Sequence, residues 1–278
     1  MGYITFNHIA TSGDTGSQVL QYWSLCAIAK ENNLEIVFPE SMISAGWGFK
    51  FCNLLDININ YKPDEFFKDF IHLNINQKVK VDKNLFNLDS NKNYNIVDLF
   101  LFCDYWYPKH SKLIESITWN KKHYLEAVNL FETIKIPNKE LVSIHVRRGD
   151  YLLPQHHHFC KLDNRYYEEA LQDFIKDIEK YHFIVFSNDI EWCKQHLIDG
   201  EMVTFMPQGI DYVDLIVMSM CNHNIIANST YSWVAAYKNN NRNKKIICPT
   251  NYVKSYSEVA ILNGNYYPQT WKNIDNDY

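Results

Sequence analysis

The sequence lacks the patterns that mark membrane-spanning and exported proteins. Its 278 residues contain no run of about 18 apolar residues, so no transmembrane span is expected. The first residues, MGYITFNHIATSGDTG, do not combine a charged start with an apolar core, so no signal peptide is expected either. The seven cysteines are odd in number and include no C-x-x-C pair, which is typical of reduced, mostly buried thiols in a cytoplasmic protein.

The sequence also lacks an excess of positive charge. It has 27 Lys and Arg residues against 32 Asp and Glu residues, which gives a formal net charge of −5. A dedicated nucleic-acid-binding protein usually carries a basic face, so no nucleic-acid partner is expected. Any affinity for a polyanion must therefore come from a local cluster of basic residues.

The second half of the chain has the pattern of an α/β domain. Short β-rich runs at 141–146 and 182–187 alternate with helical patterns, among them an amphipathic pattern at 164–181. Alternating strands and helices require crossover connections and a mostly parallel sheet. We therefore expect a Rossmann-like domain at 138–278, beginning after Pro137.

The first half is less regular. A helix is predicted at 18–33 and a strand directly after it at 34–39, whereas 40–110 shows only weak periodicity. Another helix is predicted at 120–134. A chain of this length favours two domains, or one large one, and we expect the first domain to span 1–137.

The stretch SIHVRRGDYLLPQHHHF, residues 143–159, concentrates charge at the end of a predicted strand. The carboxyl ends of parallel strands form the ligand-binding edge of such sheets, and this edge would carry His145, Arg147, Arg148 and Asp150. Adjacent guanidinium groups grip phosphate oxygens through paired hydrogen bonds and are costly to bury without an anion. The stretch therefore predicts a diphosphate partner. Two alternatives stay open: an Arg–Asp pair that braces a surface loop, and an RGD adhesion tripeptide, which needs an exposed loop.

Two further stretches predict polar groups at the same edge of the sheet. Asn228, Ser229 and Thr230 open a predicted helix, whose free N–H groups and dipole favour an anion. A simple helix cap is the alternative for these residues. Asn188 and Asp189, in FSND, follow another strand and suit a base or a ribose.

Two polar runs invite a metal interpretation, and neither supports one well. Adjacent histidines such as His156–His158, followed by Cys160, point in different directions in an extended loop, whereas metal sites use wider spacings. We interpret this run as a loop over the ligand site, where a histidine touches a substrate. The D-x-D at 275–277 lies at the terminus, where a solvated tail is the simpler interpretation.

Three ordered blocks carry a family resemblance. HVRRGDY, VFSND and LIVMSMCNHNIIANSTYSWVAAY, together with their surroundings at 138–250, resemble the α-1,2-fucosyltransferases of glycosyltransferase family 11. The first block is similar to the H-x-R-R-x-D motif that this family shares with other fucosyltransferases. The resemblance implies an α/β fold of the GT-B type, with two Rossmann-like domains facing a cleft. It makes 1–137 the acceptor-side domain and 138–278 the domain that binds a GDP-sugar.

The resemblance also implies roles for single residues. Arg147 would hold the β-phosphate and stabilise the departing GDP, with Arg148 and Asp150 in support. The other residues that it places at the donor are His145 and Asp189, with Asn188 beside them, near the nucleoside, and Ser229 and Thr230, preceded by Asn228, near the diphosphate.

The N-terminal loop resembles the family less closely. Members typically carry GGLGNQMFQYA, and the corresponding SGDTGSQVLQYW keeps Gly16 and Gln18, which we expect to bind substrate. Asp14 stands where a glycine is usual. Because this loop faces the cleft in such enzymes, Asp14 is our first candidate for the general base and His8 the second. A turn residue between two glycines is the alternative for Asp14.

The expected activity is transfer of L-fucose from GDP-β-L-fucose to a terminal galactoside hydroxyl, with inversion and an α-1,2 linkage, in bacterial O-antigen or capsule synthesis. The partners would be GDP-fucose and a galactoside-containing oligosaccharide or lipid-linked glycan. No cofactor or metal is expected. The location would be cytoplasmic, with peripheral attachment at the inner membrane left open. Another nucleotide sugar, or a non-catalytic binding protein of the same fold, are the alternatives.

Overall fold

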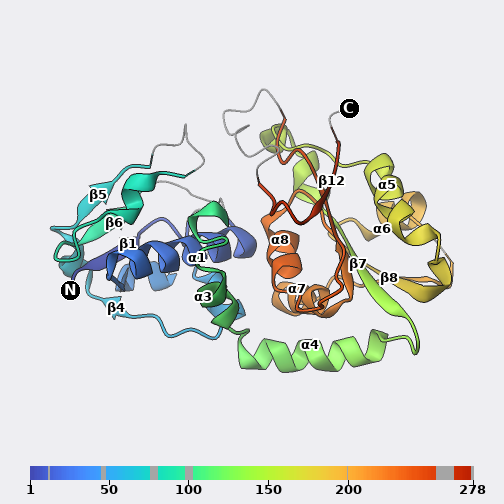
Figure 1. Ribbon diagram of the computed structural model, residues 1–278, viewed down its shortest axis with the longest axis horizontal. Coiled ribbons are helices and arrows are strands. Elements are labelled where there is room, and N and C mark those ends of the chain that lie inside the picture. The colour runs from blue at the N-terminus through green and yellow to red at the C-terminus, as the bar shows by residue number, and fades with distance from the viewer. Residues whose placement is uncertain are drawn as a thin grey trace. The chain divides into compact units, whose positions relative to one another are not determined.

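The computed structural model describes residues 1–11, 13–44, 48–75, 81–97, 103–198, 200–254 and 266–276. By its contacts the chain divides into two compact units, Met1–Lys121 and Lys122–Tyr278 (Figure 1). This division precedes the boundary expected after Pro137. Helix α4 (Lys121–Ile134) belongs to the second unit from its second residue onward, and the ring of its His123 lies 5.2 Å from the ring of Tyr212.

The first unit contains a parallel sheet of four strands in the order β2-β1-β6-β5. The strand predicted at 34–39 is divided in two between Val37 and Phe38. The amide of Val37 donates to Ile4 of the four-stranded sheet, and the next amide donates to Asn60, so the chain changes partner there. The strands are β1 (Tyr3–Phe6), β2 (Glu35–Ile36), β3 (Phe38–Pro39), β4 (Tyr61–Lys62), β5 (Ile71–Leu73) and β6 (Tyr94–Ile96), with β3 and β4 forming a separate parallel pair.

Helix α1 (Thr15–Asn32) is the central helix of the first unit. It begins three residues before the predicted helix at 18–33 and is buried around most of its circumference, as a core helix is. Trp23 on this helix packs edge-on against Trp106, with ring centroids 5.4 Å apart. Two shorter helices were not predicted: α2 (Lys50–Leu54) lies in the weakly periodic stretch 40–110, and α3 (Ser111–Ser116) follows that stretch.

The second unit contains the predicted parallel sheet. Its six strands lie in the order β12-β11-β10-β7-β8-β9, with every pair parallel. This is the doubly wound order, in which the direction of winding reverses between β7 and β10 and leaves a ligand crevice at their carboxyl ends. The strands are β7 (Glu140–Val146), β8 (Tyr181–Ser187), β9 (Val203–Phe205), β10 (His223–Ile225), β11 (Ile246–Pro249) and β12 (Lys272–Ile274).

Helices cover both faces of this sheet. In Figure 1, α5 and α6 lie on one side of β7 and β8, and α7 and α8 lie on the other. Alternation along β7 explains the arrangement, because Val142, Ile144 and Val146 enter the core cluster shared with α5, whereas His145 contacts α8. The helices are α5 (Asn164–Ile175), α6 (Ile190–His196), α7 (Asp211–Met220) and α8 (Thr230–Tyr237).

The helix predicted at 164–181 is shorter than expected. It ends at Ile175, which is 48% exposed, and a separate 3-10 turn follows at Ile178–Lys180. Ile178 still packs against the core from this turn, so the amphipathic pattern extends beyond the end of the helix. Across the described ranges, no helix combines the length and apolarity that crossing a membrane requires.

Candidate active site

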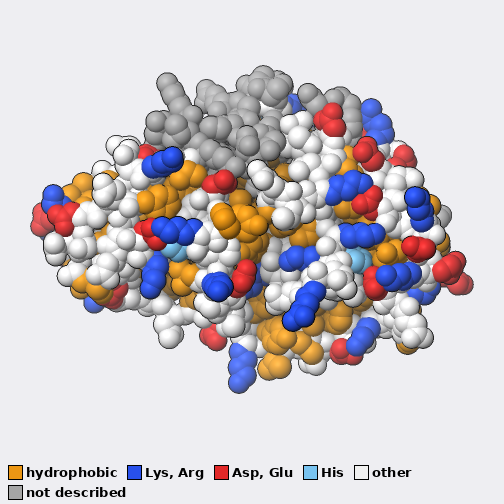
Figure 2. Space-filling model, viewed as in Figure 1, with side chains coloured by type: hydrophobic (Ala, Val, Ile, Leu, Met, Phe, Trp, Pro, Cys, Tyr) orange, Lys and Arg blue, Asp and Glu red, His pale blue; other side chains and the backbone are white. Residues whose placement is uncertain are grey.

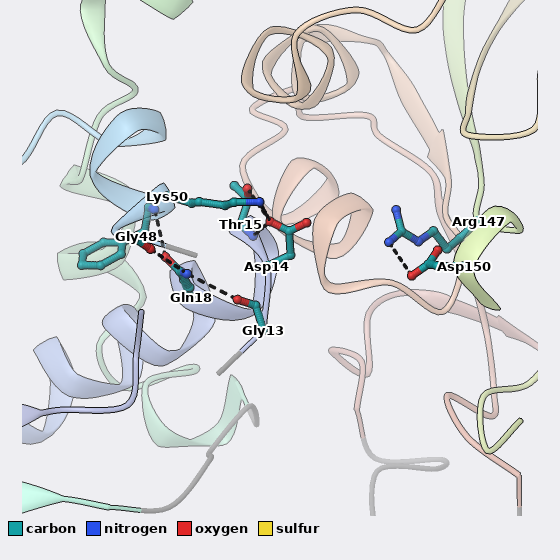
Figure 3. A network of polar contacts seen from close by, with 9 residues as sticks. Gly13, Asp14, Thr15, Gln18, Gly48, Lys50, Arg147 and Asp150 are labelled. Atoms are coloured by element: carbon teal, nitrogen blue, oxygen red, sulfur yellow. Dashed lines mark hydrogen bonds and ion pairs between the residues drawn. The ribbon is translucent and has the colours of Figure 1, made fainter. Parts of the chain in front are cut away.

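The two arginines after β7 are held by different carboxylates. Arg147 donates from Nη2 to Asp150 at 2.9 Å (Figure 3), and Arg148 donates from Nε to Asp189 at 3.1 Å. The guanidinium carbon of Arg148 also lies 4.0 Å from the ring centroid of Trp192. Arg147 therefore forms the Arg–Asp pair that was the alternative interpretation of this stretch. Arg148 instead pairs with a carboxylate that follows β8.

Both arginines keep donors that the described residues do not satisfy. The Nε atom of Arg147 is buried and has no hydrogen-bond partner in the described part of the chain. The terminal nitrogens of Arg148 make no hydrogen bond within the same residues, and its side chain is only 18% exposed. A buried, unsatisfied guanidinium donor costs free energy unless a partner arrives, so this geometry suits an anionic ligand.

Asn188 fixes the turn that follows β7. Its Oδ1 accepts from the amide of Arg148 at 3.0 Å, and its Nδ2 donates to Asp150 at 3.3 Å. A Cβ atom on Gly149 would lie 2.3 Å from Nδ2 of Asn188, so this position has no room for a side chain. The predicted contact of Asn188 with a ligand stays a prediction, because its amide already has protein partners.

Asp189 is the N-cap of α6. Its Oδ1 accepts from the amide of Trp192 at 3.3 Å, and its Oδ2 accepts from Arg148. Sequence reasoning did not predict Trp192. The available signal was the spacing in NDIEW, where a capping Asp is followed three residues later by Trp. The predicted place of Asp189 near a nucleoside is not tested by these contacts.

His145 is buried on the α8 side of the sheet. Its Nδ1 lies 2.8 Å from Oγ of Ser232, and its ring centroid lies 5.4 Å from that of Tyr231. Burial, helped by the charge of Arg147, lowers the pKa of His145 to about 3. His145 is therefore neutral at physiological pH and adds no charge to the site.

The start of α8 adjoins the arginine turn. The hydroxyl of Tyr151 donates to the carbonyl of Asn228 at 3.0 Å, and Nδ2 of Asn228 donates to the carbonyls of Cys160 and Tyr252 at 2.9 and 2.8 Å. Ser229 is the N-cap, yet its side chain makes no capping hydrogen bond. The alternative interpretation as a simple helix cap therefore does not explain the serine side chain. Thr230, the first helical residue, is buried.

These contacts bring the two predicted anion-binding features together. The arginines end β7, α8 opens after β10, and the two strands pair directly at the point where the strand order reverses. Tyr151 was not predicted, although it directly follows Asp150 in the motif. Free N–H groups at a helix start and guanidinium groups on the adjacent strand are donors that suit a diphosphate, and diphosphate binding here stays a prediction.

Asp14 caps α1 in the first unit. Its Oδ1 accepts from the amide of Thr15 at 2.7 Å and pairs with Nζ of Lys50 at 2.5 Å (Figure 3). Burial alone would raise the pKa of Asp14, but the hydrogen bonds and charge of Lys50 and Thr15 bring it below its ordinary value. Capping and ion pairing thus account for this residue locally, and its catalytic role stays a prediction. Lys50 had no signal in the sequence, because its partner lies 36 residues away.

Gln18 joins two loops of the first unit. It is fully buried, and its Nε2 donates to the carbonyls of Gly13 and Gly48 at 3.3 and 3.0 Å (Figure 3). Its Oε1 accepts from the amide of Phe51 at 3.4 Å. Gly16 is buried in the first turn of α1. These contacts give Gln18 a structural role, and substrate contacts by Gln18 and Gly16 stay predictions.

The other polar candidates lie elsewhere. His8 is exposed in the turn after β1. Within the described ranges, no group of three or more His, Cys, Asp or Glu side chains is arranged to hold a metal ion. The solvated-tail interpretation of 275–277 was wrong for Asn276, which is buried and exchanges two hydrogen bonds with the backbone of Asn251; Asp277 lies outside the described residues.

The family model of Glycosyl transferase family 11 matches residues 3–275. The chain belongs to this family. The match confirms the resemblance carried by HVRRGDY and the two later blocks, and it extends over both units.

Curated relatives of this family 11 chain match it over part of their length. The O-antigen biosynthesis glycosyltransferase WbnK of Escherichia coli is 32% identical over 130 residues, covering 44% of this chain and 42% of WbnK. An alpha-1,2-colitosyltransferase of Escherichia coli is 29% identical over 178 residues, covering 61% and 59%. The human galactoside alpha-(1,2)-fucosyltransferase 1 is 35% identical over 105 residues, covering 36% and 29%. The matched segments thus span from under a third to about three fifths of these relatives.

Solved structures show the fold. POFUT1 in complex with GDP superposes with a TM-score of 0.52 at 14% identity, covering 88% of this chain and 98% of that one. The fucosyltransferase NodZ from Bradyrhizobium gives a TM-score of 0.52 at 12% identity, covering 84% and 92%. The family 11 chain therefore has the GT-B type of α/β fold, with the parallel sheet expected in its C-terminal half.

Proposed function

We propose that this family 11 glycosyltransferase moves L-fucose from GDP-β-L-fucose to a hydroxyl of a terminal galactoside, forming an α-1,2 linkage in bacterial surface glycan synthesis. The observation that carries the proposal is the buried and unsatisfied Nε of Arg147, at the strand-order reversal beside the start of α8. The proposal is supported by WbnK, whose name assigns it to O-antigen biosynthesis, and by the human galactoside alpha-(1,2)-fucosyltransferase.

The reaction would be an in-line displacement at the anomeric carbon. The acceptor oxygen forms the new bond on one face as the bond to the β-phosphate oxygen breaks on the other, so the β-linked sugar becomes α-linked. Negative charge grows on the phosphate oxygen. Arg147, Arg148 and the amides at the start of α8 are placed to stabilise that charge, at a few kcal/mol for each well-aimed donor. In this mechanism the guanidinium groups supply the charge neutralisation that a divalent cation supplies in other transferases.

The proton of the acceptor hydroxyl must pass to a base. Asp14 is our first candidate, and its lowered pKa means that it is ionised and able to accept at neutral pH. Its ion pair with Lys50 limits its basicity, so the acceptor would have to displace Lys50 from Oδ1. His8 is the second candidate. A correctly placed base would contribute about 10²–10⁴-fold to the rate.

A second donor has support of its own. The alpha-1,2-colitosyltransferase of Escherichia coli matches 61% of this chain. Colitose lacks the 3-hydroxyl of L-fucose, so the same diphosphate site would serve both GDP-sugars. GDP-colitose is therefore the alternative donor, and a non-catalytic binding protein of the same fold is the alternative without turnover.

The test is GDP release from GDP-fucose, measured with a panel of terminal β-galactosides and in the presence of EDTA. Wild type is compared with Arg147→Ala and with Arg165→Ala. Arg165 is a matched control because it pairs with Asp163 at 2.8 Å on the surface of the same unit. Galactoside-dependent release that falls at least about a hundredfold in Arg147→Ala alone supports the proposal. If only GDP-colitose is turned over, GDP-colitose is the donor. If nucleotide binds but no sugar is transferred, the protein is the non-catalytic alternative.

A further inference from the structure

The histidine run after the arginine motif has no part in the diphosphate site described above. It lies in the loop 154–160, where the 3-10 turn Pro154–His156 leads into His157, His158 and Phe159. This loop continues the connection that leaves the carboxyl end of β7, after the arginines and the 3-10 turn Gly149–Leu152.

The backbone of this loop is fixed by its neighbours. The amide of Lys254 donates to the carbonyl of His158 at 2.8 Å, and Phe159 forms an isolated antiparallel bridge with Val253. One residue further, the carbonyl of Cys160 accepts from Asn228 at 2.9 Å. The loop is thereby tied to the residues that open α8, so its position depends on the same framework as the diphosphate site.

Its rings continue through Tyr151 to Arg147. The ring of Phe159 stacks on Tyr151 with centroids 4.2 Å apart and an interplanar angle of 4°, and Arg147 lies 5.5 Å from the Tyr151 ring. The ring of His158 lies 4.2 Å from Phe159, and that of His156 lies 5.9 Å from it. Three successive contacts therefore connect the guanidinium of Arg147 to the imidazole of His158.

The histidines differ in what their nitrogens contact. Nδ1 of His157 lies 3.0 Å from the carbonyl of Pro154. His156 and His158 are half-buried, and no hydrogen bond joins their ring nitrogens to the part of the chain that the structure describes. Burial, together with the neighbouring His156 and His157, lowers the pKa of His158, so its ring is neutral at pH 7 and offers one donor and one acceptor.

We propose that His156, His158 and Phe159 of the loop 154–160 form an acceptor subsite, in which a nitrogen of His158 hydrogen-bonds a hydroxyl of the acceptor galactoside. The proposal rests on the proposed function. A terminal sugar presents an apolar C–H face beside its hydroxyls, and a half-buried patch of rings with two unsatisfied imidazoles matches both features. The exposed Leu152 and Leu153 directly precede this loop and add apolar surface next to it.

The variant His158→Phe tests this directly, because it keeps the ring and its contact with Phe159 but removes both nitrogens. His157→Phe is the matched control on the adjacent residue. We measure kcat and KM for the galactoside at saturating GDP-fucose, GDP affinity by calorimetry, and Tm. The expected result for His158→Phe is a loss in kcat/KM for the galactoside of about tenfold or more, with GDP affinity and Tm close to wild type. His157→Phe should stay within about twofold of wild type.

Equal kcat/KM in the two variants and wild type overturns the inference and makes His158 a packing residue. Loss of GDP affinity in His158→Phe also overturns it, because the ring would then serve the donor. If wild type shows no galactoside-dependent release, the proposed function fails, and saturation-transfer NMR with the galactoside panel on the GDP-bound protein decides the inference separately. Signals that vanish only in His158→Phe support it, and equal signals or none in wild type overturn it.

Discussion

The central guanidinium carbon of Arg148 lies over the ring of Trp192, 4.0 Å from its centroid. Trp192 is itself packed against the core of the second unit, and the ring of His196 stacks on it with centroids 4.7 Å apart. Asp189 holds Nε of the same guanidinium at 3.1 Å. Two contacts from α6 and its cap therefore fix an arginine whose terminal nitrogens have no hydrogen-bond partner in the described part of the chain.

Trp192 is expected to position Arg148 for the donor. Trp192→Leu should weaken GDP binding by about 1–2 kcal/mol, because it removes the cation–π contact and lets the guanidinium move. Calorimetric GDP titration measures this, and Trp192→Phe, which keeps a ring, should recover most of the affinity. A Trp192→Leu protein that binds GDP as tightly as wild type would show that Asp189 alone is sufficient.

Gly149 is expected to tolerate no side chain while Asn188 is present. Gly149→Ala should lower the free energy of unfolding by about 1–3 kcal/mol, because the new Cβ would lie 2.3 Å from Nδ2 of Asn188. Urea unfolding measures the loss. The double variant with Asn188→Ala should lose less than the two single variants together, because the clash is gone. Strict additivity would contradict this explanation.

The ion pair of Lys50 should be visible in the titration of Asp14. The pKa of Asp14 is lowered, so its contribution to stability is present above pH 3.8 and is lost as the pH falls through the lower folded value. Because Asp14 is largely exposed, the pair should contribute no more than about 1 kcal/mol. Carbon NMR of the Asp14 carboxyl should show a higher pKa in Lys50→Met, and an unchanged titration would mean that Thr15 sets the shift instead.

His145 should make folding less favourable in acid. Its pKa falls from 6.5 to about 3 on folding, so its stabilising contribution is complete above pH 6.5 and is lost progressively as the pH falls toward 3. Between pH 7 and pH 5 the wild type should lose about 1–2 kcal/mol more than His145→Asn, which has no such titration. Urea unfolding at the two pH values gives the difference. Equal losses would place the acid sensitivity in other histidines.

The strands and helices of the second unit could be predicted because their signals are local. The run 141–146 and the run 182–187 each agree with a buried strand of the sheet, and the motif that follows the first lies at its carboxyl edge. In the first unit the corresponding signals are weak. Strands of two or three residues, such as β2 and β4, form through pairing with distant segments, so no short window of sequence contains the cause.

The same distinction holds for the site. HVRRGDY by itself determined that two guanidinium groups follow the end of a strand, and it predicted an anionic partner for them. Only the tertiary structure decided that each arginine has its own carboxylate, that Trp192 supports Arg148, and that Asn188, Asn228 and Gln18 use their amides on the protein. Residue types and their spacing encode which chemistry is available. The acceptors that pair with some hydrogen-bond donors and leave others unpaired come from segments tens of residues away. Only folding brings them within hydrogen-bond distance.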